Sequence, residues 1–531
     1  MTKSVLASCA AIAVAGSLLA LSSGSASATT SATPGAATSA AAETIVWTAC
    51  TNETLAKRGA QCGYVTAPLD YAKPDGEKIQ LAVSRIKHKT ADAAAQGPML
   101  VNPGGPGGSG LTLSVLGERV PGGAGDAYDW VGFDPRGVGE SKPAISCDPQ
   151  VFAYNRPEYV PSTKAIEVAN LKRAKAYAEA CRRSGGALLN NIETVDTIRD
   201  METIRVALGA DRISFYGFSY GSYLGQVYAT MFPKRIHRMV IDGVVDHRNV
   251  WYKANLNQNI AFDANVKTFF QWIAQNDTVY KLGPTGREVE KRYYATSVQL
   301  GRKPAGGLIG SSEFADMFLP AGYSQGRWKA IAAAFSGWVN NQDEAAAAAL
   351  KAAYDYANGP GDDNSYAVYL SVQCTDIQWP KWSRQKKDNA KVHAKAPFYT
   401  WANNWFNAPC MYWPAKAGKP VKVDPRKAPP VLIINEERDA ATPYGGALQA
   451  RKIFPKSALI STPGGTQHSV SLRGNACVDN PIAEYLRTGA LPKRQPGAGS
   501  DVECAPAPRP VATPGFAPAA EHPLDAALWR R

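Results

Sequence analysis

The stretch Gly217-Phe218-Ser219-Tyr220-Gly221 decides the fold of this 531-residue chain. The apolar run 213–216 before it is typical of a buried strand, and the run 222–232 after it has the pattern of a helix. A serine between two such elements lies on a sharp turn, with its hydroxyl exposed at a helix N-terminus. Small residues are needed at positions 217 and 221, because a Cβ there would collide with the strand and the helix. The pattern predicts that Ser219 is a nucleophile.

Strands and helices alternate on both sides of this turn. The short apolar runs 99–101, 130–133 and 239–241 end in turn signals, as buried parallel strands do. Strand-like runs return late in the chain, at 431–434 and 458–460. We therefore expect an α/β protein with a mostly parallel sheet and helices on both faces.

The pattern between the two strand-rich parts is mainly helical and rich in aromatic residues. This composition predicts a large helical cap, residues 250–415, inserted between two parts of the core at 43–249 and 416–494. Residues 495–531 are rich in Pro and Ala, and we expect this tail to be loose beyond Cys504.

The N-terminal 28 residues have the features of a signal peptide. Lys3 precedes an apolar stretch at 5–21, and Ala26-Ser27-Ala28 is a small-residue cleavage site. An uncleaved membrane anchor is the alternative. Residues 29–42 are almost wholly Ala, Ser, Thr, Gly and Pro, which predicts a disordered linker or a removable pro-segment. No later stretch is long and apolar enough to span a bilayer, so we expect a secreted protein without stable membrane association.

Eight cysteines follow the signal peptide, and an even number in a secreted chain favours disulfides. Pairing of sequence neighbours is our hypothesis: Cys50–Cys62, Cys147–Cys181, Cys374–Cys410 and Cys477–Cys504. No C-x-x-C motif or tight Cys/His cluster is present, so we expect neither a metal nor another cofactor.

The formal net charge of +13 raises the question of a nucleic-acid partner. The Lys and Arg residues are scattered, however, and their runs are short, as at 384–387. A solvated basic surface accounts for this distribution, so we expect no nucleic-acid binding. We also expect a monomeric protein.

A serine nucleophile needs a base and a group that orients that base. Among six histidines, His468 is the best placed, because it follows the last predicted strand and the turn 463–465. Asp439 is the candidate acid, since the strand 431–434 leads directly to it; Glu436 and Glu437 are the nearby alternatives. The order Ser219, Asp439, His468 is that of the α/β-hydrolase fold, which we predict for this chain.

Acyl transfer also requires backbone N–H donors that face the developing oxyanion. The glycine-rich segment 102–108 follows the predicted strand 99–101, and its glycines let the chain turn sharply. We expect one donor at Gly105, with Gly104 as the alternative, and the other at Tyr220. The segment carries neither a phosphate-binding nor a dinucleotide-binding pattern.

Several motifs together resemble a known family. They are Cys62-Gly63 with the segment 65–71, the loop 104–108, the segment 133–141, the turn at Ser219 and the segment 439–443. The chain resembles the prolyl-aminopeptidase-type serine peptidases, and within them it is most similar to the secreted tripeptidyl aminopeptidases of Streptomyces. It departs from many relatives at Asn102-Pro103, where they carry His-Gly.

The resemblance implies an exopeptidase that releases tripeptides from peptides and proteins with free N-termini. Ser219 would attack the peptide bond, His468 would transfer the proton and Asp439 would hold His468. By analogy, the cap would supply carboxylates for the substrate ammonium group, and Asp376 and Glu313 are the candidates. A prolyl aminopeptidase, an esterase or lactonase, and a noncatalytic extracellular binding protein on the same scaffold are the alternatives.

Overall fold

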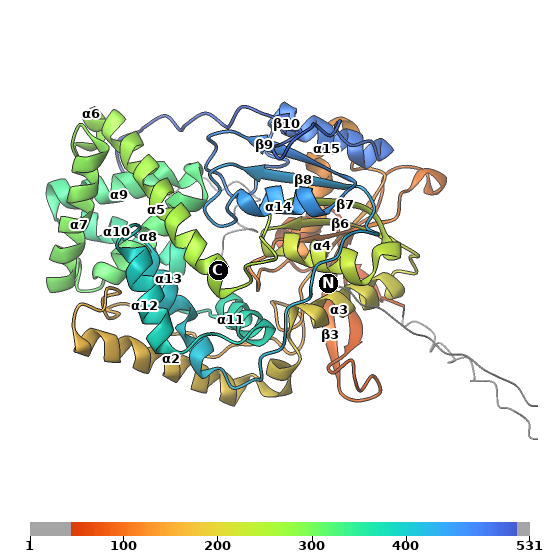
Figure 1. Ribbon diagram of the computed structural model, residues 1–531, viewed down its shortest axis with the longest axis horizontal. Helices are drawn as coiled ribbons and strands as arrows, with labels where there is room; N and C mark the ends of the chain where they lie inside the picture. Colours follow the sequence, from red (N-terminus) through yellow and green to blue (C-terminus); the bar gives the residue numbers. More distant parts are fainter. Residues whose placement is uncertain (1–43, 518–531) are drawn as a thin grey trace, which may run out of the picture. The chain divides into compact units, whose positions relative to one another are not determined.

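The computed structural model describes residues 44–517, which form one compact unit around a ten-stranded sheet. The strand order is β1-β2-β3-β5-β4-β6-β7-β8-β9-β10, with antiparallel pairing up to β5 and parallel pairing from there on. Figure 1 shows the sheet with helices on both sides. The predicted mostly parallel α/β architecture is confirmed. The predicted signal peptide and linker, 1–28 and 29–42, lie outside the described residues.

The strands of the sheet have the following bounds: β1 Thr48–Ala49, β2 Gln61–Pro68, β3 Lys78–Ile86, β4 Pro98–Asn102, β5 Asp129–Phe133, β6 Ile213–Phe218, β7 Ile236–Asp242, β8 Val431–Glu436, β9 Ser457–Thr462 and β10 Val502–Glu503. Every strand of the parallel part, β4 to β9, is buried along its whole length or at all but one residue. This burial explains why these strands are continuous apolar runs in the sequence.

Successive side chains of each strand point to opposite faces and build two cores. In β8, for example, Val431 and Ile433 pack on one face, whereas Leu432 and Ile434 pack on the other. Helices α3 (Thr194–Ala207), α4 (Tyr220–Met231) and α14 (Gly445–Ile453) cover the first face. The 3₁₀ helix η2 (Leu111–Arg119) and α15 (Ala476–Thr488) cover the second.

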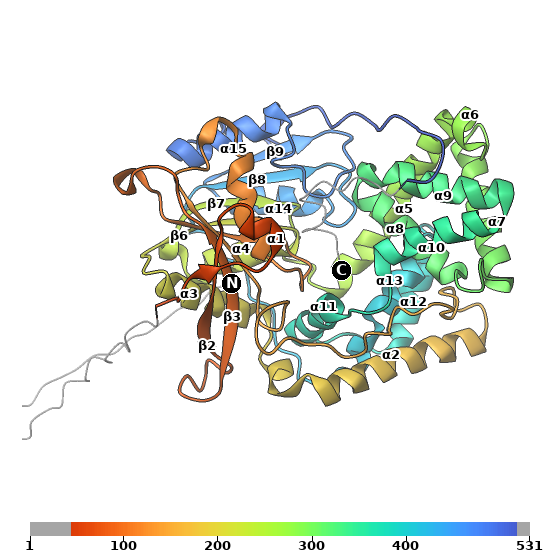
Figure 2. The ribbon, with the colours of Figure 1, turned by 180° about the vertical axis from the view of Figure 1, so that it is seen from behind.

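A helical layer lies beside the carboxyl ends of the parallel strands (Figures 1 and 2). Between β7 and β8 it contains α5 (Tyr252–Gln275), α6 (Asp277–Tyr280), α7 (Gly286–Arg302), α8 (Ser311–Tyr323), α9 (Trp328–Asn341), α10 (Glu344–Asn358), α11 (Asn364–Asp376), α12 (Trp382–His393) and α13 (Thr400–Asn407). Aromatic side chains such as Phe269, Phe318 and Trp328 form a separate core within it. We call this layer the cap. The domain boundaries drawn from the sequence stay predictions.

Helix α2 (Lys164–Ser184) precedes the turn at Ser219 in sequence but lies along the cap. Its Glu167 accepts hydrogen bonds from Trp382 and Lys386 of α12. Part of the cap therefore comes from the first half of the chain, outside the predicted insertion at 250–415.

The C-terminal segment is more closely packed than its composition predicts. Strand β10 pairs with β9, and Asp501 forms a buried ion pair with Arg451 at 2.6 Å. Beyond Cys504 the chain runs along the cap, where the Trp272 indole donates to the Pro510 carbonyl oxygen at 3.0 Å and Phe516 packs on the cap core. Most side chains of residues 505–517 are nevertheless exposed, so the contacts with the cap are confined to a few positions and the loose tail stays a prediction.

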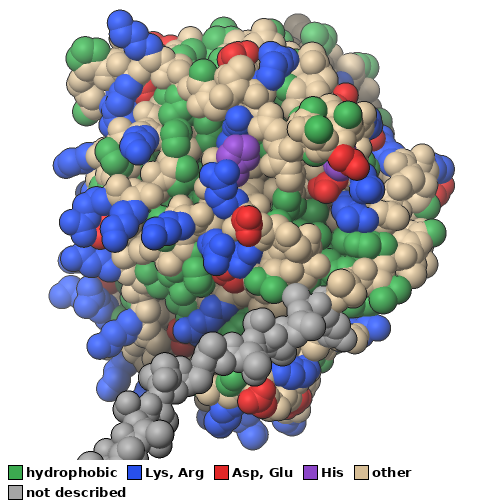
Figure 3. Space-filling view, turned by 90° about the vertical axis from the view of Figure 1, so that its right-hand side faces the viewer, with side chains coloured by type: hydrophobic (Ala, Val, Ile, Leu, Met, Phe, Trp, Pro, Cys, Tyr) green, Lys and Arg blue, Asp and Glu red, His purple; other side chains and the backbone are tan. Residues whose placement is uncertain are grey.

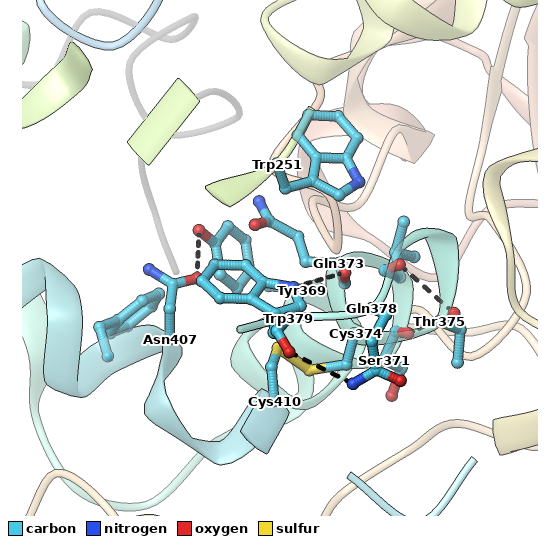
Figure 4. Close-up of a disulfide and its surroundings, with 12 residues drawn as sticks. Trp251, Tyr369, Ser371, Gln373, Cys374, Thr375, Gln378, Trp379, Asn407 and Cys410 are labelled. Carbon is cyan, nitrogen blue, oxygen red and sulfur yellow. Dashed lines mark hydrogen bonds between the residues drawn. A yellow bond between two sulfur atoms is a disulfide. The ribbon is translucent and has the colours of Figure 1, made fainter. Parts of the chain in front are cut away.

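Four disulfides join the cysteine neighbours that the sequence analysis paired: Cys50–Cys62, Cys147–Cys181, Cys374–Cys410 and Cys477–Cys504. Four such bonds in one chain are typical of an oxidising compartment. Figure 4 shows the Cys374–Cys410 bond, which ties α11 to the turn after α13. Beside it the Tyr369 hydroxyl donates to Asn407 at 3.0 Å.

The face of the molecule in Figure 3 carries more Lys and Arg than Asp and Glu side chains, interspersed with other residues. This surface is in keeping with the net charge of +13. Among residues 44–517, no helix is long and apolar enough to cross a membrane.

A buried ion pair fixes the loop that follows β5. The Arg136 guanidinium binds both carboxylate oxygens of Asp200 on α3, at 2.7 and 2.6 Å. It also donates to the carbonyl oxygens of Leu69 and Asn191. Both side chains are fully buried, so each charge depends on the other.

We predict that Arg136→Ala lowers the free energy of unfolding by about 3–5 kcal/mol, because it leaves the Asp200 carboxylate buried and uncompensated. Urea denaturation measures this loss. The double variant Arg136→Met, Asp200→Leu should recover much of it, since neither charge remains. A loss below about 1 kcal/mol for Arg136→Ala would match an exposed pair and contradict this role.

Candidate active site

Ser219 lies on the turn between β6 and α4 with φ 55° and ψ −123°. A non-glycine residue rarely adopts this conformation, and the surrounding backbone must hold it there. The Ser219 N–H donates to the Asp242 carbonyl oxygen at 2.9 Å. A Cβ at Gly217 would lie 2.3 Å from the Gly221 carbonyl oxygen, and one at Gly221 would lie 2.7 Å from the Asn102 carbonyl oxygen. The predicted reason for both glycines is confirmed.

His468 and Asp439 come together at the same edge of the sheet. His468 is in the loop between β9 and α15, and Asp439 follows β8. The distance from His468 Nδ1 to Asp439 Oδ2 is 2.6 Å, and both side chains are fully buried. A carboxylate in this position holds the imidazole with Nδ1 protonated, which leaves Nε2 as the basic nitrogen.

The structure also separates Asp439 from its two sequence neighbours. The Glu436 carboxylate accepts the Gln467 N–H, and burial raises the pKa of Glu436 to about 8. Glu437 is exposed and accepts the Gly464 N–H at 3.2 Å. Of the three carboxylates, only Asp439 forms a hydrogen bond with His468 among residues 44–517.

Thr442 supports the pair and was not singled out from the sequence. Its hydroxyl donates to Asp439 Oδ2 at 2.7 Å and lies 3.1 Å from His468 Nδ1. The Ala441 and Thr442 amides donate to Asp439 Oδ1, both at 2.9 Å. The run Asp439-Ala440-Ala441-Thr442 thus supplies hydrogen bonds to both oxygens of the carboxylate, which the sequence analysis did not predict.

The glycine-rich loop lies directly against the turn at Ser219. A Cβ at Gly104 would lie 2.7 Å from the Tyr220 nitrogen and 2.8 Å from Ser219 Cβ. The Gly104 N–H donates to the Asn102 side chain at 2.9 Å, so Gly104 is not a free donor. The Gly105 N–H has no hydrogen bond to another described residue. The geometry therefore favours Gly105 over Gly104 as the oxyanion donor beside Tyr220.

A cavity of about 230 Å³ opens over Ser219 and lies between the core and the cap. Ser219, Tyr220 and the loop residues Gly104 and Gly105 line its core side. The cap side is aromatic and carboxamide-rich: it includes Trp251, Asn255, Gln258, Tyr323, Arg327, Tyr356, Asn358, Tyr366, Tyr369, Gln373, Tyr399, Asn403 and Phe406. Among the described lining residues, Asp246 and Arg327 carry the charges.

Neither carboxylate expected to bind the substrate amine lines this cavity. Glu313 is fully buried in the cap. Its carboxylate accepts hydrogen bonds from the Arg156 guanidinium and from the Gly310 N–H, both at 3.0 Å. It is a capping residue of α8 rather than a surface of the cavity. The expectation for Glu313 is therefore corrected.

Asp376 lies behind the cavity wall. Its carboxylate accepts hydrogen bonds from the Thr194 N–H at 2.7 Å, the Thr194 hydroxyl at 2.6 Å and the Trp251 indole at 2.9 Å. Burial raises its pKa to about 6. The expectation for Asp376 is corrected as well: it orients Trp251, which lines the cavity, and does not itself reach the substrate space.

No group of three or more His, Cys, Asp or Glu within residues 44–517 has an arrangement that could hold a metal ion.

Two family models match the chain: an alpha/beta hydrolase fold model at residues 97–309, and a model described as TAP-like protein at residues 396–504. A tripeptidyl aminopeptidase of Streptomyces coelicolor is 41% identical over 486 residues, which cover 90% of this chain and 89% of that protein. The chain belongs to the tripeptidyl aminopeptidase family. It is an α/β-hydrolase and a serine hydrolase of the peptidase type.

More distant members of the same group carry other names. Serine protease Hip1 of Mycobacterium tuberculosis is 29% identical over 474 residues, which cover 84% of this chain and 89% of that protein. Carboxylesterase B of the same organism is 30% identical over 498 residues, which cover 89% and 92%. Both peptidase and esterase names therefore occur among proteins that align with nearly the whole chain.

We predict that Ser219→Ala abolishes hydrolysis and that Asp439→Asn lowers kcat by up to about 10⁴-fold, because an asparagine favours the wrong imidazole tautomer. Steady-state kinetics on the purified variants measures both losses. Glu437→Gln is the matched control, because Glu437 is an exposed carboxylate in the same turn; its kcat should equal that of the wild type. Wild-type kcat in Asp439→Asn would contradict the assignment of the acid.

Proposed function

We propose that this protein is a secreted serine exopeptidase that releases tripeptides from the free N-termini of peptides and proteins. The observation that carries the proposal is the 2.6 Å contact of His468 with Asp439 at the sheet edge that also presents Ser219 to a cap-covered cavity. The 41% identity to a Streptomyces tripeptidyl aminopeptidase supports the cleavage length. Secretion is supported by the signal-peptide pattern and by the four disulfides.

In the proposed mechanism, Ser219 Oγ attacks the carbonyl carbon after the third residue of the substrate, and His468 Nε2 takes the hydroxyl proton. Asp439 stabilises the imidazolium through the Nδ1 hydrogen bond. The Gly105 and Tyr220 amides bind the oxyanion of the tetrahedral intermediate. His468 then gives the proton to the leaving amine, and the C–N bond breaks to form the acyl-enzyme. Water, activated by His468, hydrolyses this ester and regenerates Ser219.

Recognition of the substrate is proposed to depend on carboxamides rather than on the cap carboxylates expected from the sequence. Seven Asn and Gln side chains line the cavity: Asn249, Asn255, Asn257, Gln258, Asn358, Gln373 and Asn403. A carboxamide donates and accepts hydrogen bonds, as a peptide main chain does, and its oxygen also accepts from an ammonium group. The aromatic side chains between them suit apolar substrate side chains.

Asp246 is the carboxylate on the cavity wall. Although burial raises its pKa, the hydrogen bonds from Arg248 hold the pKa of Asp246 below its ordinary value, so the group stays ionised. It is the negative charge that the proposal assigns to attraction of the substrate ammonium.

We predict that the protein cleaves a tripeptide chromogenic amide with a free amine at least 10-fold faster than its N-acetylated form, since acetylation removes the positive charge and two of the three N–H donors. Chromophore release, measured side by side for both substrates, tests this. The Ser219→Ala protein is the control for contaminating peptidases. Equal turnover of the two forms would exclude the exopeptidase.

An esterase is the second candidate, because carboxylesterase B aligns over 89% of the chain. Mass spectrometry of peptides digested by the protein separates the two functions. Successive losses of three residues from the N-terminus support the tripeptidyl aminopeptidase, whereas intact peptides together with rapid hydrolysis of short acyl esters support the esterase.

A further inference from the structure

Asp242, the last residue of β7, contacts both the nucleophile and the loop that carries the base. Its carbonyl oxygen accepts the Ser219 N–H at 2.9 Å. Its carboxylate accepts the Ser471 N–H at 2.8 Å and the Ser471 hydroxyl at 2.6 Å. Ser471 is three residues after His468 in the same loop. One residue thus holds Ser219 with its main chain and the His468 loop with its side chain.

The two residues after Asp242 extend these contacts to the base and the acid. A Cβ at Gly243 would lie 2.9 Å from His468 Cε1, so the backbone there lies directly against the imidazole ring. The Gly243 N–H donates to the Ile434 carbonyl oxygen at 3.1 Å, and the Val244 N–H donates to the Asn435 side chain at 2.7 Å. Ile434 and Asn435 belong to β8, which leads to Asp439.

The Asp242 carboxylate is fully buried. One of its oxygens takes both bonds from Ser471, and the other has no hydrogen-bond partner among residues 44–517. A buried carboxylate with one bare oxygen is costly unless a positive charge forms nearby. Four titratable groups face this carboxylate. They are His468 in its loop, Glu436 at the end of β8, Asp439 in the turn that follows β8, and Tyr216 on β6. Of these four, only His468 becomes positively charged.

Burial raises the pKa of Asp242 to about 6, and the Ser471 bonds oppose this increase. The carboxylate is therefore mostly ionised at neutral and weakly alkaline pH. It does not line the cavity, so a substrate does not reach it.

We propose that Asp242 is a positioning residue of this active site, which fixes Ser219 and the His468 loop relative to each other and places a second buried negative charge behind the imidazole. The inference rests on the proton transfer of the proposed function. When Ser219 Oγ bonds to the substrate carbonyl, its proton moves to His468 Nε2, and the new imidazolium is stabilised directly by Asp439 and at longer range by Asp242. Asp242 itself gains and loses no proton.

The conservative variant Asp242→Asn tests the charge. Its carboxamide oxygen can still accept both Ser471 bonds, but the negative charge is gone. Loss of a nearby negative charge makes the imidazolium less stable, so the base loses its proton at lower pH. In a plot of kcat/KM against pH, the rise on the acidic side, which we call the acid limb, should move to lower pH by about one unit. This is the lower end of the pKa shift that a nearby opposite charge causes. kcat at the optimum should fall about 10-fold with an unchanged KM.

A second variant, Asp479→Asn, separates the charge from loop anchoring. The Asp479 carboxylate on α15 accepts the Leu472 N–H at 2.7 Å and the Gly474 N–H at 2.8 Å, so it holds the same loop further along. Asp479→Asn should lower kcat and leave the acid limb in place. Thermal unfolding establishes that each variant is folded.

Each profile is measured with a tripeptide amide and with p-nitrophenyl acetate, an activated ester that needs no peptide recognition. Ester turnover without amide turnover would exclude the tripeptidyl aminopeptidase and still leave the acid limb of every variant measurable. NMR titration of the His468 imidazole makes the same comparison without substrate. The proposal is overturned if Asp242→Asn leaves both the acid limb and the imidazole titration within error of the wild type, or if Asp479→Asn moves them equally.

Discussion

The turn at Ser219 is the constraint on which the other parts of the site depend. A non-glycine residue whose backbone has a positive φ costs about 1–3 kcal/mol of conformational strain, and this conformation persists only where the surrounding structure enforces it. Here the surroundings are the backbone atoms around the turn. Gly217 and Gly221 lie too close to neighbouring backbone atoms for either position to carry a Cβ, and the Ser219 N–H donates to the Asp242 carbonyl oxygen. Ser219 lines the cavity at this turn, and the loops after β8 and β9 carry the hydrogen-bonded pair Asp439 and His468.

The cap encloses a cavity over Ser219. Its own aromatic core makes it a stable layer, and the Cys374–Cys410 disulfide together with the Trp251–Asp376 hydrogen bond fixes the part of it that faces Ser219. The buried charges of the cap and core serve this rigidity: Glu313 binds Arg156, and Asp200 binds Arg136. In the proposed function, substrate contacts are made mainly by neutral groups, the carboxamides and aromatic rings of the wall. Neutral groups cost less to desolvate than charges when a peptide enters.

The sequence predicted the parts of the fold that local patterns determine. Buried parallel strands, the Gly-Ser-Gly turn and the order Ser219, Asp439, His468 are each visible over a few residues. Contacts between distant segments were not visible. No local pattern near Asp376 indicates that Thr194, 182 positions earlier, donates hydrogen bonds to its carboxylate. No local pattern near Glu313 indicates that it pairs with Arg156. The anchoring of Ser471 by Asp242, across 229 positions, was missed for the same reason. The contacts of the C-terminal segment with Trp272 and the cap core were likewise not visible in its Pro- and Ala-rich composition.

The central claim is that Ser219 is activated by His468 in the folded protein. Reaction with a fluorophosphonate probe, followed by mass mapping of the modified peptide, tests it most directly. We expect one adduct per chain, on Ser219. No adduct should form when the protein is unfolded by heat before the probe is added, or when His468 is replaced by alanine in a folded variant. An adduct on another residue, or a folded wild-type protein that does not react, would contradict the account.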